Sequence, residues 1–252
     1  MDIKLIVATH KNYILPHDEM YLPVYAGASV CPDEISDVVP DNTGENISFL
    51  NPYYCELTAL YWAWKNLSYT HLGLMHYRRY LTLKKGDSLD CILTKEQIVE
   101  LFSETDIILP KAHDYRIETN YSQYIHAHHK QDIDVVKEII DTFYPSYKCA
   151  FETVMKQRSG HRCNLFIMDK EKADDYLSWL FSVLLRFDGM VDMHDYSDAD
   201  KRAAGHIAER LLDVWIEKNG YSYKELPVYF TENQNLFARY TKFVLRKFGI
   251  KF

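Results

Sequence analysis

Short apolar runs alternate with helical patterns in the first 110 residues, and this alternation constrains the fold more than any other sequence feature. Residues 3–9 and the run that begins at His71 are apolar and of strand length. Residues 53–67 repeat apolar side chains at helical spacing, and residues 94–101 open with a capping box. An apolar run then ends at Pro110. This order predicts an α/β fold with a mostly parallel, Rossmann-like central sheet flanked by helices.

The second half of the chain continues the pattern less regularly. We expect a strand at residues 163–169, helices at 170–187 and 200–220, and a final strand at 223–230. Gly220 stands where a helix C-cap is expected. Residues 111–133 are polar, aromatic and rich in histidine, so we predict an active-site loop or lid there.

Two further segments complete the predicted organisation. Residues 31–52 are rich in Asp, Asn, Pro and Gly and are typical of a long surface loop. Because we find no internal repeat and no flexible linker, residues 1–236 are interpreted as one domain.

Composition excludes several classes of protein. A formal net charge of −7 argues against a nucleic-acid-binding protein, because phosphate neutralisation needs a basic face. The five cysteines include no CxxC pair, which argues against a zinc knuckle and fits a reducing cytoplasm. The N-terminal residues lack the features of a signal peptide, and no run of 18 apolar residues could span a bilayer. We therefore expect a cytoplasmic protein.

Two adjacent arginines follow the apolar run that begins at His71. Arg78 and Arg79, with His76, fall at the expected carboxyl end of a central strand. Paired guanidinium groups bind diphosphates through fork-shaped, charge-assisted hydrogen bonds. The alternative is a pair of solvated charges on an edge strand.

The end of the first apolar run is a second candidate binding region. Thr9, His10 and Lys11 follow residues 3–8, as in a loop at the carboxyl edge of a sheet, where ligands bind. Gly27 lies between small residues, where the backbone could approach a ligand closely.

The sequence contains two Asp-x-Asp pairs, which in many nucleotide-sugar enzymes hold Mg²⁺ or Mn²⁺ against a diphosphate. Asp132 with Asp134, and Asp198 with Asp200, match by letter but precede helices, where Asp is favoured as a cap or first-turn charge. The histidines at 126, 128 and 129 lack a third ligand at suitable spacing. We predict no metal site, and a divalent cofactor, Mn²⁺ or Mg²⁺, is left without a convincing ligand set.

A carboxylate within an apolar helical pattern is the leading candidate for a general base. Glu209 and Arg210 follow His206 by one turn in the segment GHIAERLL. A carboxylate supported by a neighbouring base-like group could accept a proton from a hydroxyl, and a structural Glu–Arg ion pair is the alternative. Asp192, in the loop DGMVDMHD, is the second candidate.

The last 16 residues form a segment of distinct composition. Residues 237–252 contain five Lys or Arg and no acidic residue, interleaved with aromatic side chains. In a protein of charge −7, this composition predicts a segment that lies on an anionic membrane surface. A tail packed on the acidic body of its own chain is the alternative.

Five stretches together resemble the bacterial glycosyltransferases of capsule and exopolysaccharide gene clusters, a family that includes galactofuranosyltransferases. The matching stretches are residues 8–11 (ATHK), 56–66 (ELTALYWAWKN), 73–81 (GLMHYRRYL), 164–168 (NLFIM) and 205–211 (GHIAERL). They cover nearly the whole chain and occur in the order of the family.

The resemblance implies a GT-A-like fold that transfers a sugar from a nucleotide diphosphate donor to a glycan acceptor. UDP is the expected nucleotide, and galactofuranose or galactose the first candidate for the sugar. The nucleotide would bind at Thr9, His10 and Lys11, and Arg78 and Arg79 would replace the metal in neutralising the diphosphate. Asn164, His206 and Arg210 are the residues expected to bind the sugar or acceptor.

The same resemblance implies a lipid-linked glycan acceptor, and hence an enzyme on the inner face of the cell membrane. Two other classes remain open from the sequence. A non-catalytic carbohydrate-binding module would use the aromatic residues, which make up 14% of the chain. A metal-dependent hydrolase is the third class.

Overall fold

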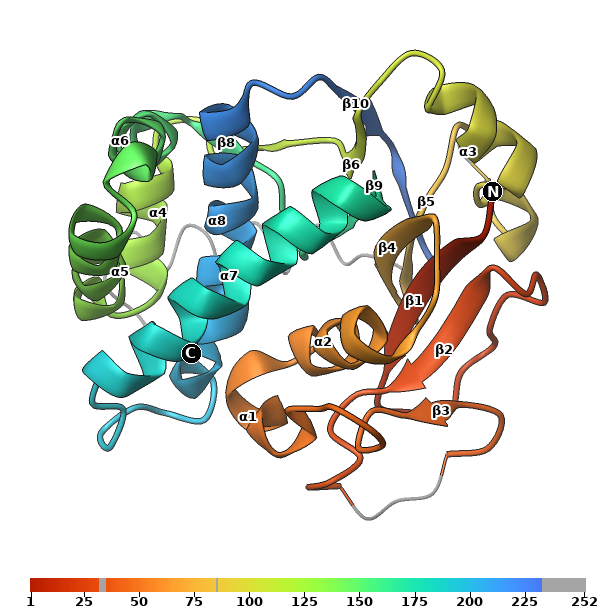
Figure 1. Cartoon of the computed structure of the whole chain (residues 1–252), viewed down its shortest axis with the longest axis horizontal. Coiled ribbons are helices and arrows are strands. Elements are labelled where there is room, and N and C mark those ends of the chain that lie inside the picture. Colours follow the sequence, from red (N-terminus) through yellow and green to blue (C-terminus); the bar gives the residue numbers. More distant parts are fainter. Residues whose placement is uncertain (32–34, 85, 233–252) are drawn as a thin grey trace.

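The computed structural model describes residues 1–31, 35–84 and 86–232, and Figure 1 shows their arrangement. The strands are β1 (Ile3–Thr9), β2 (Tyr21–Tyr25), β3 (Val39–Pro40), β4 (His71–His76), β5 (Arg79–Leu81), β6 (Ile107–Pro110), β7 (His113–Asp114), β8 (Ser159–Gly160), β9 (Phe166–Asp169), β10 (Tyr223–Leu226) and β11 (Val228–Phe230). The central sheet has the order β10-β6-β9-β4-β1-β2-β3, with β5 joined to β4 and β11 joined to β5. Strands β7 and β8 form a separate ladder.

Eight α-helices and four short 3₁₀ turns connect the described strands. The helices are α1 (Asn51–Tyr54), α2 (Leu57–Asn66), α3 (Lys95–Leu101), α4 (Asn120–Ala127), α5 (Lys130–Phe143), α6 (Lys148–Lys156), α7 (Lys170–Met190) and α8 (Ala203–Asn219). The turns are η1 (Ser48–Leu50), η2 (Leu89–Cys91), η3 (Pro145–Tyr147) and η4 (Asp200–Arg202). Of the helices in the described part of the chain, none is long and apolar enough to cross a membrane.

The central sheet is mostly parallel, which confirms the predicted α/β fold. Strands β3, β2, β1 and β4 pair in parallel, as do β6 and β10. Strand β9 runs antiparallel to both of its neighbours, β4 and β6, and the short strands β5 and β11 also pair in antiparallel fashion. The beginning of β9 therefore lies at the same edge of the sheet as the carboxyl end of β4.

Both faces of the sheet are buried, as expected for parallel strands. Ile6 of β1 belongs to a core formed with helices α2, α7 and α8. Its neighbours Leu5 and Val7 point the other way, into a second core with Ile98 of α3 and Tyr80 of β5. The period of two along β1 thus divides its apolar residues between two cores.

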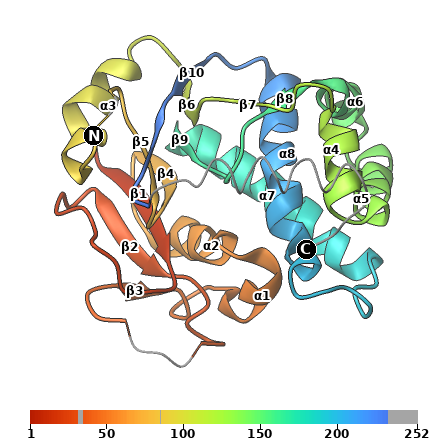
Figure 2. The same ribbon diagram turned by 180° about the vertical axis from the view of Figure 1, so that it is seen from behind.

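Helices α4, α5 and α6 lie beside α8, away from strands β1, β2 and β3 (Figures 1 and 2). This region includes residues 111–133, for which the prediction of a loop or lid is wrong from Asn120 onwards. Thr119 and Ser122 form a capping box that starts α4. Asp132 is fully buried and accepts hydrogen bonds from the hydroxyls of Tyr124 (2.8 Å) and Tyr196 (2.6 Å). A helix packed around a satisfied carboxylate replaces the expected loop.

Two other predictions need correction. The final strand is divided at Pro227, because β10 pairs with β6 whereas β11 turns to pair with β5. The segment predicted as a long surface loop, residues 31–52, also contains buried polar residues among those that the structure describes. Asp41 is fully buried and accepts hydrogen bonds from the backbone N–H groups of Gly27 (2.8 Å) and Ala28 (3.0 Å). The helices predicted at 170–187 and 200–220 and the capping box at Thr94 are confirmed.

Two glycines give a matched test of the end of α8. Gly220 has φ +65° and open space where a Cβ would stand, so only its backbone conformation opposes a side chain. We expect Gly220→Ala to lower the free energy of unfolding by about 1 kcal/mol.

Gly189 lies within α7 and also has open space around it. Gly189→Ala should leave stability unchanged or raise it by up to about 0.5–1 kcal/mol. Urea unfolding of both variants measures the difference, and equal effects would contradict the assigned helix end.

Candidate active site

Polar side chains from several elements meet at one edge of the sheet. Strands β1 and β4 are parallel neighbours, with Ala8 opposite His76. Strand β9 begins at the same edge, with Phe166 opposite Leu74. Asn164, two residues before β9, donates a hydrogen bond from Nδ2 to the carbonyl of Gly205 near the start of α8 (3.2 Å). Two strand ends, the approach to β9 and the first turn of α8 are thus adjacent.

The sequence HYRR forms a tight turn at this edge. His76 ends β4, Tyr77 and Arg78 form the turn, and Arg79 begins β5 opposite His76. Nε2 of His76 donates to the carbonyl of Cys163 (2.8 Å), so Nδ1 is free to accept from Nη1 of Arg79 (3.3 Å). Burial, together with the charge of Arg79, holds the pKa of His76 below its ordinary value against the opposing charge of Glu56. A neutral imidazole therefore positions the Arg79 guanidinium.

The second arginine of the motif has different surroundings. Arg78 donates from Nη1 to Oε2 of Glu232 (3.2 Å), and its side chain is 38% exposed. Its guanidinium lies over the ring of Tyr77. The pKa of His10 is lowered by burial and by the charges of Lys11, Arg78 and Arg202. Arg79 thus faces the interior of the site, whereas Arg78 lies at its surface beside His10.

Glu209 lies in the interior of the site on α8. Its Oε1 accepts from the backbone N–H of Cys163 (2.7 Å), and its Oε2 accepts from Nη1 of Arg210 (3.1 Å). Burial opposes ionisation most strongly, but the charges of Arg210, Arg162 and His206 outweigh it and lower the pKa of Glu209. Glu209 therefore lies in the candidate site and also forms an ion pair with Arg210, which was the alternative interpretation.

His206 and Arg210, expected to bind the sugar or acceptor, flank Glu209 on α8. Arg210 is buried, and its Nη2 donates to the side chain of Gln123. The His206 ring stacks on His128 with centroids 4.2 Å apart. Burial and the charges of Arg210 and Arg202 lower the pKa of His206, although Glu209 acts in the opposite direction.

A second carboxylate, Glu56, occupies the same site and was not singled out from the sequence. Its Oε1 accepts from Nδ2 of Asn164 (2.8 Å) and lies 3.8 Å from Nε2 of His76. The side chain is 15% exposed. Glu56 directly precedes α2, so only contacts with residues 20 and 108 positions away reveal its place. No local spacing signal could have identified it.

Arg202 is the other residue that the sequence did not indicate. It lies at the N-terminal boundary of α8, and its Nε donates to Sγ of Cys55 (2.9 Å). Its charge contributes to the lowered pKa values of both His10 and His206. The charge of Arg202 therefore acts both on His10, just after β1, and on His206, in the first turn of α8.

Positive charge exceeds negative charge at this edge of the sheet. We call the following side chains the cationic cluster: Lys11, Arg78, Arg79, Arg162, Arg202 and Arg210. Three carboxylates among the described residues lie within 4 Å of a member of the cluster or of His76: Glu56, Glu209 and Glu232. A local excess of cations in a chain of net charge −7 is suited to an anionic ligand, and guanidinium groups favour phosphate oxygens.

The backbone is strained at the same place. Cys55, Cys163 and Asn164 have φ values of 52°, 70° and 53°, which non-glycine residues rarely adopt. Such conformations cost about 1–3 kcal/mol each and persist where surrounding contacts enforce them. Here the carbonyl of Cys163 is fixed by His76 and its N–H by Glu209. These two hydrogen bonds hold the strained backbone of Cys163 in one orientation at the candidate site.

The other predicted nucleotide-binding residues surround the end of β1. Thr9 is buried, and its hydroxyl donates to the carbonyl of Lys11 (2.8 Å), which shapes the turn that presents His10 and Lys11. Gly27 has φ +83°, and a Cβ there would stand 2.5 Å from the side chain of Asn51. The close approach at Gly27 is therefore made by the protein's own Asn51, and ligand contact there stays a prediction.

Asp192, the second candidate base, lies in the exposed loop after α7. Its Oδ1 accepts from the backbone N–H of His194 (2.9 Å). None of its described contacts joins it to the cationic cluster.

The Asp-x-Asp pairs form local structural contacts, the first in α5 and the second in the turn that leads into η4. Asp134 pairs with Lys130 (2.5 Å) and Asp198 with Lys201 (3.2 Å). In the described part of the chain, no group of three His, Cys, Asp or Glu side chains is arranged to hold a metal ion.

Comparison with known proteins places the chain in a sequence family and beside one solved structure. Residues 4–220 match the model of a family described as a domain of unknown function, DUF4422. No curated protein sequence matches the chain. The apo structure of WbbM, a bifunctional glycosyltransferase, is similar, with a TM-score of 0.83 and 32% sequence identity over 92% of this chain. The match covers 46% of that protein, so this chain spans about half its length.

The lowered pKa of His76 predicts how stability depends on pH. Unfolded His76 titrates near pH 6.5, so the contribution of the buried, neutral ring to the free energy of unfolding is complete above that pH. The contribution is lost as the pH falls below 6.5 towards the folded pKa. One such group changes the free energy of unfolding by up to about 1.4 kcal/mol per pH unit. Between pH 6.5 and 5, His76→Gln should lose stability less steeply than the unchanged protein in urea unfolding.

The matched control is His194→Gln, because the His194 side chain is 87% exposed. This variant should keep the pH dependence of the unchanged protein. Identical slopes for the His76 variant and the unchanged protein would contradict a buried, neutral His76.

Proposed function

We propose that this chain, which belongs to the DUF4422 family, is a glycosyltransferase that uses a nucleoside diphosphate sugar as its donor. The observation that carries the proposal is the cationic cluster at the carboxyl edge of the sheet. Its six cations surround a site built by strand ends, the location at which ligands of α/β sheets bind. The likeness to a bifunctional glycosyltransferase supports the same class of reaction.

The proposed reaction moves a sugar between two oxygens. The acceptor hydroxyl oxygen forms a bond to the anomeric carbon of the donor sugar, either directly or after an enzyme-bound stage. The bond from that carbon to the diphosphate breaks, and the nucleoside diphosphate leaves with the electron pair. The hydroxyl proton passes to a carboxylate. Negative charge develops on the leaving diphosphate, so fixed cations near it lower the barrier.

Arg79 is the residue best placed for this task. Neutral His76 accepts from its guanidinium and holds it in position before substrate arrives. Preorganised charge is effective because no reorganisation is needed during the reaction. Arg78, at the surface beside His10 and Lys11, would contact the outer part of the nucleotide.

The proton acceptor would be one of two carboxylates. Glu209, indicated by the sequence, is kept ionised by Arg210 and Arg162, as a base must be. The same ion pairs reduce its basicity. Glu56 accepts from the neutral Asn164 amide and lies close to His76. We propose Glu209 as the base. If variants of Glu209 stay active, the role of base is assigned to Glu56 instead.

Finer details of the proposal come from the sequence resemblance. They are a UDP-linked galactofuranose or galactose donor, a lipid-linked polysaccharide acceptor, and action at the inner membrane surface. The basic aromatic residues 237–252, expected to contact that surface, lie outside the described residues. Dependence on Mn²⁺ or Mg²⁺ is tested by adding either ion, or a chelator, to the binding assays below.

Substitution of Arg79 tests the proposed donor site. UDP, GDP and dTDP share the diphosphate, so calorimetry with each identifies the nucleotide that binds. Arg79→Ala should raise its Kd roughly 10- to 150-fold, which corresponds to the loss of about 1.5–3 kcal/mol from a charge-assisted hydrogen bond. Arg78→Ala should have a smaller effect, because its guanidinium is more exposed and is shared with Glu232.

Arg186→Ala is the control, since Arg186 lies on α7 over the ring of Phe143. It should bind the nucleotide unchanged. Unaltered affinity in Arg79→Ala would refute the assignment of the diphosphate site. Nucleotide binding without any turnover of the corresponding sugar nucleotide would instead favour a non-catalytic protein.

Substitution of the two carboxylates separates catalysis from binding. Glu209→Gln preserves size and should lower kcat by at least 100-fold, typical of a lost general base, with nucleotide Kd changed only a few-fold. Glu56→Gln is measured alongside it. A Glu209→Gln protein with unchanged kcat across pH, together with an inactive Glu56→Gln protein, would transfer the role of base to Glu56.

A further inference from the structure

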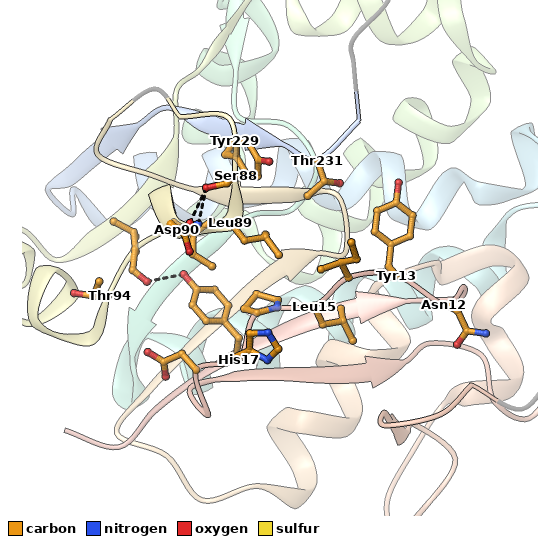
Figure 3. Close-up of a pocket in the computed structure, with 16 residues that line it drawn as sticks. Asn12, Tyr13, Leu15, His17, Ser88, Leu89, Asp90, Thr94, Tyr229 and Thr231 are labelled. Carbon is orange, nitrogen blue, oxygen red and sulfur yellow. Dashed lines mark hydrogen bonds between the residues drawn. The ribbon is translucent and has the colours of Figure 1, made fainter.

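An open cavity of about 1070 Å³ lies beside the candidate active site. Its walls come from the loop of residues 12–18, from residues 88–94 and from the strand end at Tyr229 and Thr231. Figure 3 shows the side chains of the loop facing those of Ser88, Leu89 and Tyr229 across the cavity. The cavity is separate from the cationic cluster, with which it shares no lining residue.

The lining differs in charge from the cationic cluster. No Lys or Arg is present in the described residues that line the cavity, whereas Asp18 and Asp90 contribute carboxylates. Aromatic rings and aliphatic side chains, among them Tyr229 and Leu89, form most of the surface. Asn12 and Ser88 add groups able to form hydrogen bonds. These walls would repel a phosphate and suit an uncharged molecule that has apolar faces and hydroxyl groups.

The cavity nevertheless adjoins the site through one of its walls. Tyr13 lines it, and the Tyr13 ring lies 4.7 Å from that of Tyr77, whose ring lies 5.2 Å from His10. The Tyr13 hydroxyl also donates to Glu232, the residue that accepts from Arg78. A molecule in the cavity would therefore have one end next to the cationic cluster.

We infer that this cavity binds the uncharged saccharide end of the acceptor. The inference rests on the proposed function, and it assigns the two parts of the site by charge. The anionic donor binds the guanidinium groups, and the neutral acceptor binds the aromatic and carboxylate-bearing cavity. The apolar C–H faces of a pyranose would pack on the tyrosine rings, and its hydroxyls would donate to Asp90 and Asn12.

Saturation-transfer NMR with small glycosides tests this assignment in the whole protein. The probes are the methyl β-glycosides of galactose, glucose and N-acetylglucosamine, with galactose 1-phosphate as the anionic comparison. At least one methyl glycoside should bind, and galactose 1-phosphate should not compete with it. Tyr229→Ala and Asp90→Lys should each weaken that binding at least tenfold while UDP affinity stays unchanged.

Asp195→Lys is the matched control for the charge reversal, because the Asp195 side chain is 97% exposed and lies outside the cavity. It should bind glycoside and UDP normally. The inference is overturned if no methyl glycoside binds, if both cavity variants bind it normally, or if galactose 1-phosphate displaces it. Failure of the unchanged protein to bind any nucleotide would instead refute the proposed function, so the two failures are distinguishable.

Discussion

The hydrogen bonds of His76 hold the candidate site in one arrangement. One ring nitrogen fixes the Cys163 carbonyl and the other receives Arg79. The Cys163 N–H in turn binds Glu209, so strand β4, the approach to β9 and helix α8 are joined through a single residue. Burial favours the neutral imidazole, which is the form able to accept from a guanidinium. The guanidinium of Arg79 is thus held by a neutral group, and no carboxylate among the described residues forms an ion pair with it.

This arrangement separates two kinds of surface that a transfer reaction needs. The cationic cluster lies around the ends of β1 and β4, the approach to β9 and helix α8, whereas the neighbouring cavity has no described Lys or Arg in its lining. Tyr13 and Glu232 connect the two. A charged donor and an uncharged acceptor would therefore be sorted by electrostatics and brought together at Arg78. The similar glycosyltransferase is about twice as long as this chain, and the match covers 46% of it.

The sequence predicted those features that depend on local periodicity or on chain ends. Strand β1, the capping box at Thr94 and the C-cap at Gly220 follow from patterns within a few residues. The site was predicted where a motif coincided with a strand end, as at His76. Glu56 and Arg202 could not be predicted, because their partners lie far along the chain. The reversed direction of β9 likewise depends on pairing with β4 and β6, which no local pattern records.

A crystal structure of the protein with UDP would test the central claim most directly. The account predicts diphosphate oxygens within hydrogen-bonding distance of the Arg79 guanidinium, with the imidazole of His76 still donating to the Cys163 carbonyl. The base and ribose would extend towards His10 and Lys11, leaving the cavity lined by Tyr229 unoccupied. A diphosphate bound elsewhere, or a nucleotide seated in that cavity, would contradict the assignment of the donor to the cationic cluster.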